Sequence, residues 1–252
     1  MFRNLCIDRS LNPSRASHTL CKSARQFIPR SHRRDTLMIV NYVQARERMI
    51  HEQLVSRGIN DARVLKAMAR VPRHLFLEKE LWDQAYEDHP LPIGANQTIS
   101  QPYMVALMAE ALELKGAEKV LEVGTGSGYA AAVLSELCAE VFTVEAVEDL
   151  ALKARTLLSG LGHRNVWVLA GDGTLGWEEH APYEAVLISA AAPCIPRPLL
   201  EQLKTPGHLV FPMGEKELQT LVRIRKDKAG IREEYLGECL FVKLKGRYGW
   251  ED

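Results

Sequence analysis

The sequence lacks several features that would place it in a narrow class of protein. Its 32 Lys and Arg residues balance its 32 Asp and Glu residues, so the formal net charge is zero. Because nucleic-acid binding usually needs a basic surface, the overall charge gives no case for a nucleic-acid partner. The apolar runs are short, and we expect no segment that spans a membrane.

Cysteine is scarce and scattered. The five cysteines are odd in number, and no two form a Cys-x-x-Cys pair or a spacing suited to zinc. The eight histidines are equally dispersed, and none is evidently paired with Cys194 as a base for a nucleophile. We therefore expect no metal, and reduced thiols in a cytoplasmic protein. The cysteines are Cys6, Cys21, Cys138, Cys194 and Cys239.

Residues 1–37 lack the continuous apolar core of a signal peptide, and they contain eight Lys or Arg residues against Asp8 and Asp35. Three interpretations remain open: an organelle transit peptide, a disordered arm, or upstream sequence before a start at Met38. The composition favours a disordered or artefactual extension over a targeting signal. Residues 38–252 are then expected to form the folded domain.

A glycine-rich segment is the most informative feature that is present. An apolar run ends at Val123, three alternating glycines follow, and a helix-like run begins at Tyr129. This order predicts a buried strand, a tight turn and a helix N-terminus, where glycines let a ligand approach backbone N–H groups. The spacing Gly-x-Gly-x-Gly differs from the Gly-x-Gly-x-x-Gly of dinucleotide sites. The glycines are Gly124, Gly126 and Gly128.

Glu145 ends an apolar strand 21 residues after Gly124. An acid at this place can accept hydrogen bonds from both hydroxyls of a ribose. Alone, Glu145 could be an ordinary surface acid, and the glycine loop a plain turn. Together they predict a nucleoside-containing cofactor at the carboxyl edge of a parallel sheet.

The hydrophobic pattern predicts an α/β fold with a helical addition at its N-terminus. Before residue 114 we expect a helix over 42–57 stopped by Gly58, a helix from an Asn60 or Asp61 cap to Met68, a short helical segment over 73–81, and loop or edge structure over 86–94. From Lys119 strands alternate with helices in a doubly wound sheet, and two alternating segments, 218–225 and 235–244, predict an antiparallel pair at its edge. The expected strands are 119–123, 141–145, 165–170, 184–189 and 207–212, and the helices 127–138, 148–160 and 197–204.

Asp172 and Gly173 close the third of these strands. The pair could form an ordinary turn, since Asp and Gly are turn formers. At the carboxyl end of a sheet strand, however, a carboxylate could accept a hydrogen bond from an adenine amino group. The small residues 189–193, which end the next strand, could be packing filler or could leave room for a substrate.

The segment Gln97-Thr98-Ile99-Ser100 precedes a strongly periodic helix that starts near Pro102. Ser100 is placed either to cap this helix or to present a hydroxyl to a carboxylate at the helix N-terminus. The sequence alone does not decide between these two roles.

These blocks together resemble the protein-L-isoaspartate O-methyltransferase family. The resemblance covers roughly residues 43–244, with a tail at 247–250 that some bacterial members share. The glycine loop alone would indicate only a methyltransferase that uses S-adenosylmethionine, and the Thr98-Ile99-Ser100-Gln101-Pro102 block makes the assignment specific. One departure is Asn96, where the family commonly has glycine, although Asn tolerates a left-handed backbone. The remaining blocks are 71–76, 91–94, 171–173 and 190–193.

The resemblance implies a seven-stranded, mostly parallel Rossmann-like sheet, with residues 38–114 covering substrate and cofactor and 115–252 forming the core. It implies methyl transfer from S-adenosyl-L-methionine to the α-carboxyl of L-isoaspartyl residues in damaged proteins, followed by succinimide formation. The partners would be isoaspartyl proteins and peptides, with no nucleic acid or membrane, and the enzyme a cytoplasmic monomer without metal.

By the same resemblance, Ser100 is the residue expected to contact the reacting groups. Three alternatives remain: another methyltransferase acting on RNA, an NAD(P)-dependent oxidoreductase, and a binder without catalysis. The balanced charge argues against the RNA methyltransferase, and the glycine spacing argues against the oxidoreductase. The intact Ser100 argues against the binder without catalysis. The expected cofactor-binding residues are Thr98, Ile99, Gly124, Thr125, Gly126, Gly128, Glu145, Asp172 and Gly173.

Overall fold

The computed structural model describes residues 41–215 and 218–250. Its contacts divide the chain into Met1–Ile39 and Val40–Asp252, and the fold below is that of the second unit. The interpretations of residues 1–37 therefore lie outside the described residues. No helix among the described residues is long and apolar enough to cross a membrane.

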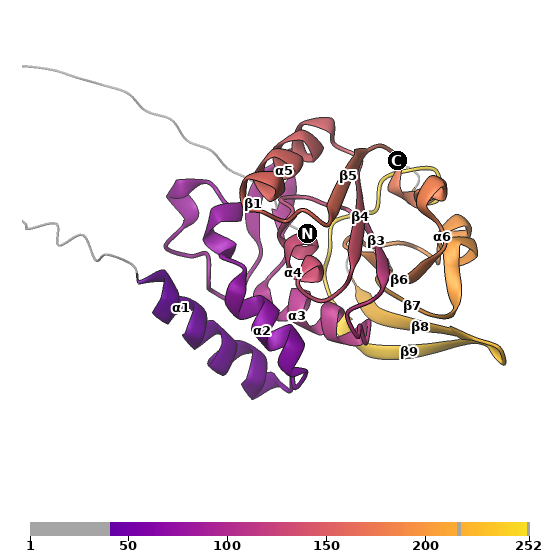
Figure 1. Cartoon of the computed structure of the whole chain (residues 1–252), viewed down its shortest axis with the longest axis horizontal. Coiled ribbons are helices and arrows are strands. Elements are labelled where there is room, and N and C mark those ends of the chain that lie inside the picture. Colours follow the sequence, from indigo (N-terminus) through magenta and orange to yellow (C-terminus); the bar gives the residue numbers. More distant parts are fainter. Residues whose placement is uncertain (1–40, 216–217, 251–252) are drawn as a thin grey trace, which may run out of the picture. The chain divides into compact units, whose positions relative to one another are not determined.

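The expected α/β sheet is confirmed. Seven strands lie in the order β5-β4-β3-β6-β7-β8-β9 (Figure 1), parallel from β5 to β7 and antiparallel from β7 to β9. The order reverses beside β3, so the loops after β3 and β6 flank the point where ligands bind in open α/β sheets. The strands are β3 Lys119–Val123, β4 Glu140–Glu145, β5 Val166–Ala170, β6 Tyr183–Ile188, β7 Leu203–Gly214, β8 Gln219–Asp227 and β9 Gly230–Cys239.

Helices cover both faces of the sheet, as the doubly wound prediction requires. Val120 of β3 belongs to a core cluster that includes residues of the helices α3 Pro102–Ala111, α4 Tyr129–Ser135 and α5 Glu148–Gly160. Leu121 and Val123 belong to a second cluster with Leu199 of α6 Arg197–Gln202. This alternation follows from the period of two along a strand. Short 3₁₀ turns, η5 Gly173–Leu175 and η6 Glu178–His180, precede β6.

The N-terminal addition begins with one irregular helical stretch. The predicted single helix over 42–57 is divided into α1 Tyr42–Arg48, the π-helical η1 Met49–Leu54 and the 3₁₀ turn η2 Val55–Arg57, and it ends at left-handed Gly58. Met49 and Leu54 are both fully buried. Since they are five residues apart, a π-helical turn brings both to one face, which a regular α-helix would not do. An apolar period of 3.6 residues could not reveal this.

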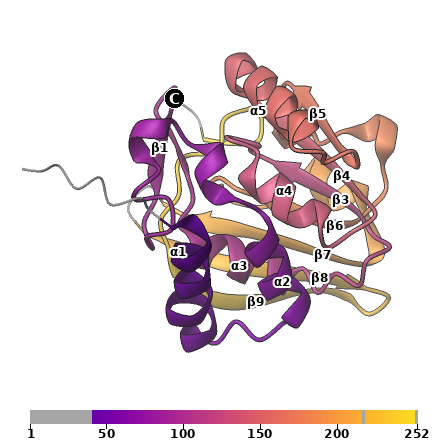
Figure 2. The same cartoon turned by 60° about the vertical axis from the view of Figure 1, so that its left-hand side comes forward.

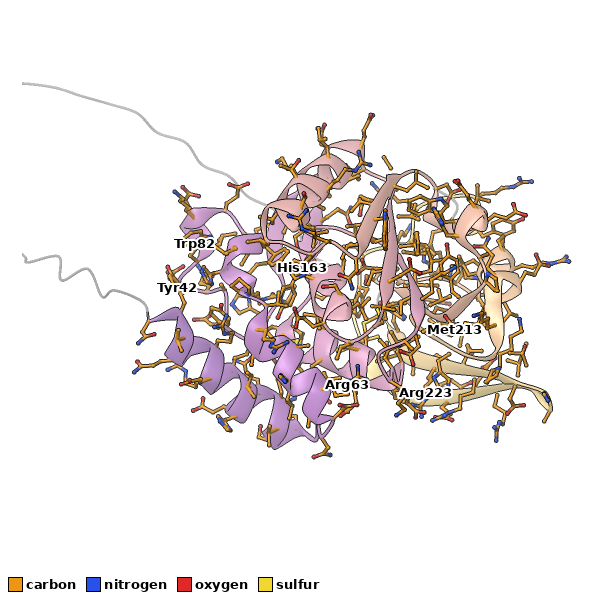
Figure 3. The ribbon with its side chains drawn as sticks, viewed as in Figure 1. Tyr42, Arg63, Trp82, His163, Met213 and Arg223 are labelled. Atoms are coloured by element: carbon orange, nitrogen blue, oxygen red, sulfur yellow. The ribbon has the colours of Figure 1, made fainter. Side chains whose placement is uncertain are left out.

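Two further helical segments complete the addition. Asp61, one of the two predicted caps, accepts hydrogen bonds from the N–H groups of Arg63 and Val64 at the start of α2 Ala62–Arg70. The segment after Pro72 consists of two 3₁₀ turns, η3 Arg73–Phe76 and η4 Lys79–Leu81. Tyr42 packs edge-on against Trp82 with ring centroids 5.9 Å apart (Figure 3).

The predicted loop or edge structure near residue 90 is a small hairpin. β1 Leu91–Gly94 pairs antiparallel with β2 Gln97–Ile99. Ala95 and Asn96 have φ of 50° and 56°. A hairpin turn of this kind needs φ > 0 at both central residues, so the left-handed backbone expected at Asn96 is confirmed. The turn presents residues 97–100 to the sheet edge.

Three predicted elements have wrong boundaries. Gly128 has φ of 89°, so α4 starts at Tyr129 rather than at residue 127, and it ends at Ser135. The helix expected to reach residue 204 ends at Gln202, and β7 begins at once. β9 starts at Gly230 and ends at Cys239, so residues 240–244 lie outside the strand. Three charged residues near its start, Arg232, Glu233 and Glu234, lie in this edge strand, and they hide any alternation of apolar and polar residues there.

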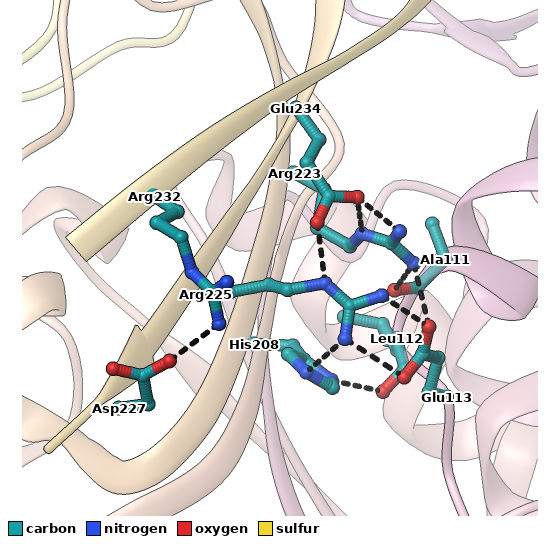
Figure 4. Close-up of polar contacts among 9 residues, drawn as sticks. All are labelled: Ala111, Leu112, Glu113, His208, Arg223, Arg225, Asp227, Arg232 and Glu234. Atoms are coloured by element: carbon teal, nitrogen blue, oxygen red, sulfur yellow. Dashed lines mark hydrogen bonds and ion pairs between the residues drawn. The ribbon is translucent and has the colours of Figure 1, made fainter. Parts of the chain in front are cut away.

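An ion-pair network ties the end of α3 to β8 and β9 (Figure 4). Arg225 donates to Glu113 and Glu234, and Arg223 donates to the same two carboxylates. His208 of β7 bonds the backbone oxygen of Leu112 through Nδ1 at 2.9 Å. The hydrogen bond from Arg225 is the main cause that lowers the pKa of Glu113. The network fixes α3, and with it the turn before α3, against the sheet.

Candidate active site

The glycine loop joins β3 to α4 at the carboxyl edge of the sheet. Gly124, Gly126 and Gly128 have φ of 92°, 53° and 89°, which favour glycine over any other residue. A Cβ on Gly128 would also lie 3.1 Å from Cδ1 of Leu158, so α4 could not pack as closely on α5. The sequence order strand, turn and helix predicted this loop.

Glu145 lies beside the loop at the end of β4, as predicted, and its side chain is buried. Its Oε2 accepts a hydrogen bond from the N–H of Gly126 at 2.8 Å, and its Oε1 accepts one from Val147 at 3.0 Å. A carboxylate has about four acceptor sites. Two sites therefore remain for hydroxyl groups, while the other two accept from Gly126 of the loop and from Val147 after β4.

A buried polar chain under the loop was missed from the sequence. Thr125 and Thr143 share a hydrogen bond of 2.6 Å, and Thr143 donates to Glu122 Oε2 at 2.6 Å. Burial raises the pKa of Glu122 to about 8, so this carboxyl holds its proton at neutral pH. Its Oε1 has no hydrogen-bond partner in the described part of the chain. The signal was an acid inside the apolar run Val120-Leu121-Glu122-Val123.

Ser100 does not cap α3, which excludes one of the two roles that the sequence left open. The N-cap residue is Gln101, which makes no side-chain cap, and Pro102 occupies the first turn. The N–H of Tyr103 instead donates to Asp88 Oδ1 at 3.2 Å. An acid from the loop before β1 has taken the capping role, which leaves the Ser100 hydroxyl at the site.

Gly173 lies at the site because it packs against β3. A Cβ there would come within 2.5 Å of Cγ1 of Val123, so no larger residue fits without movement. Asp172 is engaged elsewhere: Oδ1 accepts from the N–H and hydroxyl of Thr174, and Oδ2 accepts from the N–H of Arg247 at 2.8 Å. Its expected contact with adenine stays a prediction.

Most of the predicted residues meet at one cavity of about 90 Å³. Thr98, Ile99 and Ser100 line it from one side, and the glycine loop with Glu145 from the other. Two predicted residues, Gly128 and Asp172, are not part of the lining. The predicted residues that line it are Thr98, Ile99, Ser100, Gly124, Thr125, Gly126, Glu145 and Gly173.

A groove of about 600 Å³ adjoins the cavity and shares several of its lining residues. That volume is within the about 300–1,000 Å³ of typical ligand pockets. Ser100 and Ser189 line both spaces. Ala191 and Ala192, by contrast, are fully buried, so the small residues after β6 serve both as lining and as packing filler.

The C-terminal segment after β9 is the second part of the site that sequence reasoning missed. Val242, Lys243 and Lys245 line both the cavity and the groove. Figure 2 shows this segment in yellow as it runs from β9 towards the C-terminus. The backbone of Leu244 donates to Ala191 at 2.8 Å, which holds the segment against the end of β6. No recognisable motif marks it, because its place depends on contacts between distant parts of the chain.

Comparison with known proteins decides the family. The profile of the Protein-L-isoaspartate(D-aspartate) O-methyltransferase (PCMT) family matches residues 44–249. This chain belongs to that family. It is 53% identical over 213 residues to protein-L-isoaspartate O-methyltransferase 1 of Syntrophobacter fumaroxidans, covering 84% of this chain and all of that protein. It is 55% identical to the Geobacter metallireducens protein-L-isoaspartate O-methyltransferase, covering 84% of this chain and 98% of that one.

Solved structures of the family have the same fold. One protein-L-isoaspartate O-methyltransferase gives a TM-score of 0.74 at 29% identity, over 81% of this chain and 67% of that chain. A Plasmodium falciparum protein described as a PCMT, in complex with S-adenosyl-L-homocysteine, gives 0.68 at 26% identity, over 79% and 98% of the two chains.

The site suits the S-adenosyl-L-methionine of this methyltransferase family. Gly124, Gly126 and Gly173 line the cavity without side chains that would reduce it, and Glu145 offers two acceptor positions beside it. No group of three or more His, Cys, Asp or Glu residues that could hold a metal occurs in the ranges that the structure describes. The expected absence of metal stays a prediction.

Proposed function

We propose that the protein transfers a methyl group from S-adenosyl-L-methionine to the α-carboxylate of L-isoaspartyl residues in damaged proteins and peptides. The observation that carries this proposal is the junction of cavity and groove at Ser100. The residues expected to bind the nucleoside-containing donor line the cavity, and the groove beside it suits a length of peptide. A carboxylate from the groove can therefore meet the activated methyl at one place.

The proposed donor-binding residues surround the cavity. Glu145 would hold the ribose hydroxyls, and the loop Gly124–Gly128 would allow the close approach of the donor to backbone N–H groups. Thr98 and Ile99 would cover the donor from the hairpin side, and Gly173 would leave room for a flat base. Asp172 would accept from the adenine amino group once its present contacts rearrange.

The chemistry asks little of the protein's acid–base groups. Bound S-adenosyl-L-methionine supplies a methyl group already activated by its sulfonium. The isoaspartyl carboxylate is ionised at neutral pH and needs no general base. The residues therefore act by alignment and by removing water from the carboxylate, which can contribute several kcal/mol. We assign the alignment of the carboxylate to the hydroxyl of Ser100.

The product is a methyl ester at the isoaspartyl α-carboxyl. The neighbouring backbone nitrogen attacks this ester, methanol leaves and a succinimide forms. Water then opens the succinimide to normal aspartate or to isoaspartate, so repeated cycles repair the chain. Only the methylation step needs the enzyme.

One incubation tests the proposal against its alternatives. Labelled S-adenosyl-L-methionine is offered with an isoaspartyl peptide, with the same peptide containing aspartate, and with bulk RNA. We expect label in the first only. Label in RNA would favour a nucleic-acid methyltransferase, and no label in any substrate would favour a binder without this activity.

Three further expectations form part of the proposal. Monomeric state is checked by light scattering after gel filtration. Action in the cytoplasm suits the free thiols Cys138, Cys194 and Cys239 among the described residues.

A chain starting at Met38 is expected to keep its melting temperature and peptide methylation, because α1 starts at Tyr42 and is capped by Asn41. A large loss of either would show that residues 1–37 belong to the domain.

A further inference from the structure

Two lysines give the groove its charge. Among the 13 described residues that line it, Lys243 and Lys245 are the only ones with a charged side chain. The others carry amide, hydroxyl or apolar groups. A groove without acids and with two cations is complementary to an anionic ligand.

Both lysines are free to act on a ligand. Neither forms an ion pair within residues 41–215 and 218–250, and both are exposed. The nearest specific contact is that of Lys243 Nζ, which lies 5.6 Å from the ring centroid of Trp250. Seven other Lys or Arg residues form ion pairs with acids, and others donate to backbone oxygens, as Lys226 does. The two lysines are thus available to a bound peptide.

The backbone holds the two lysines in place. Lys243 forms a parallel bridge with Ala191, and the Leu244 N–H donates to Ala191. Leu244 is buried, and Trp250 Nε1 donates to Ala191 oxygen at 2.9 Å. In an extended segment residues two apart lie on the same face. Leu244 therefore faces the core, while Lys243 and Lys245 face the groove.

The lysines are unsuited to grip the reacting carboxylate itself. An ammonium bound to the attacking oxygen would stabilise its negative charge before reaction more than during it, since that charge is lost as the ester forms. Their useful target is a second anion on the same peptide. We propose that Lys243 and Lys245 are specificity-determining residues that favour isoaspartyl peptides with an acidic side chain next to the isoaspartyl residue. This inference rests on the proposed methyl transfer.

The test uses three isoaspartyl peptides that differ only in the residue after isoaspartate: Glu, Gln or Lys. We expect the full chain to prefer Glu over Lys by about three- to tenfold in kcat/KM at low salt, the size that two exposed ion pairs give. The difference between the peptides should appear in KM rather than in kcat. It should also shrink in 0.5 M NaCl, where screening acts over about 4 Å.

Substitutions test whether the peptide preference comes from these two lysines or from the overall charge of the protein. K243Q/K245Q should lose the preference, whereas K243R should keep it. The control K66Q removes an exposed lysine of α2 that lines no part of the groove, and it should keep both the preference and the basal activity. Melting temperatures check that each variant folds. If the double variant does not fold, the salt dependence of the unchanged protein decides.

Direct binding gives a readout besides turnover. Fluorescence anisotropy with labelled peptides, in the presence of S-adenosyl-L-homocysteine, should show the same order of affinities. Equal affinity for the three peptides, or a preference that survives K243Q/K245Q or high salt, would overturn the inference while leaving the methyl transfer standing. Failure to methylate any isoaspartyl peptide would instead overturn the proposed function.

Discussion

The carboxylate of Glu145 accepts a hydrogen bond from the backbone N–H of Gly126, with 2.8 Å between Oε2 and N. The residue proposed to hold the ribose therefore also fixes the middle of the glycine loop. Ligand binding and loop geometry are coupled through one side chain. Loss of this carboxylate should weaken the cofactor site in two ways.

We predict that Glu145→Ala weakens binding of S-adenosyl-L-methionine by about 1.5–3 kcal/mol, because two hydroxyls lose a charged acceptor. That corresponds to about a 10- to 150-fold rise in Kd. Isothermal titration calorimetry measures this Kd. The variant Glu145→Gln keeps one acceptor oxygen, so its Kd should lie between those of the unchanged protein and Glu145→Ala. An unchanged Kd in Glu145→Ala would remove the ribose assignment.

Gly173 offers a matched pair of substitutions. A Cβ on Gly173 would lie 2.5 Å from Val123 Cγ1, whereas one on Gly171 would meet nothing within 4 Å. We expect Gly173→Ala to cost about 1–3 kcal/mol of stability through overpacking, and also to weaken cofactor binding. Gly171→Ala should leave the free energy of unfolding nearly unchanged. Urea titrations of both variants give the answer, and equal losses would show that the space at Gly173 is not the cause.

Glu122 should make stability fall as pH rises. Burial raises its pKa in the folded protein to about 8, from the ordinary value of 4.5 that it has in the unfolded chain. Below pH 4.5 both states are protonated, so the group has no effect. Between these values the unfolded state ionises first, so the free energy of unfolding decreases with pH.

Glu122→Gln tests this directly, because glutamine keeps an acceptor for Thr143 and cannot ionise. We expect the variant to be more stable than the original protein at pH 8 and equally stable near pH 4. Chemical denaturation across this range measures the difference. An equal pH slope in both proteins would exclude Glu122 as its source.

Local patterns in the sequence were enough to predict the parallel strands, the glycine loop and the place of Glu145 at the end of a strand. Each depends on residues close together in the chain: an apolar run, a turn, an acid at a strand end. The cap of α3 could not be decided from the sequence, because Asp88, 15 residues before Tyr103, supplies it and only the fold brings the two residues together. Lys243 and Lys245 were missed for the same reason, since only the folded chain brings them to Ser100. The π-helical turn at Met49 follows from packing of the core, which an ideal helical period does not describe.

Ser100 gives the sharpest test of a single residue. Since it does not cap α3, Ser100→Ala should leave the melting temperature nearly unchanged. If the hydroxyl aligns the isoaspartyl carboxylate or the donor, kcat should fall by about ten- to a hundredfold, as one lost positioning contact of about 1.4–2.7 kcal/mol predicts. Thermal unfolding and peptide methylation on the same sample measure both. Normal turnover would place Ser100 outside the chemistry.

The central claim is methyl transfer to the isoaspartyl α-carboxyl, and mass spectrometry of one peptide over time tests it most directly. The protein is incubated with S-adenosyl-L-methionine and an isoaspartyl peptide, beside the same peptide containing aspartate. The account predicts that only the isoaspartyl peptide gains a single methyl group, then loses methanol to form the succinimide, and finally yields normal aspartate. Methylation of both peptides alike, or of neither, would contradict it.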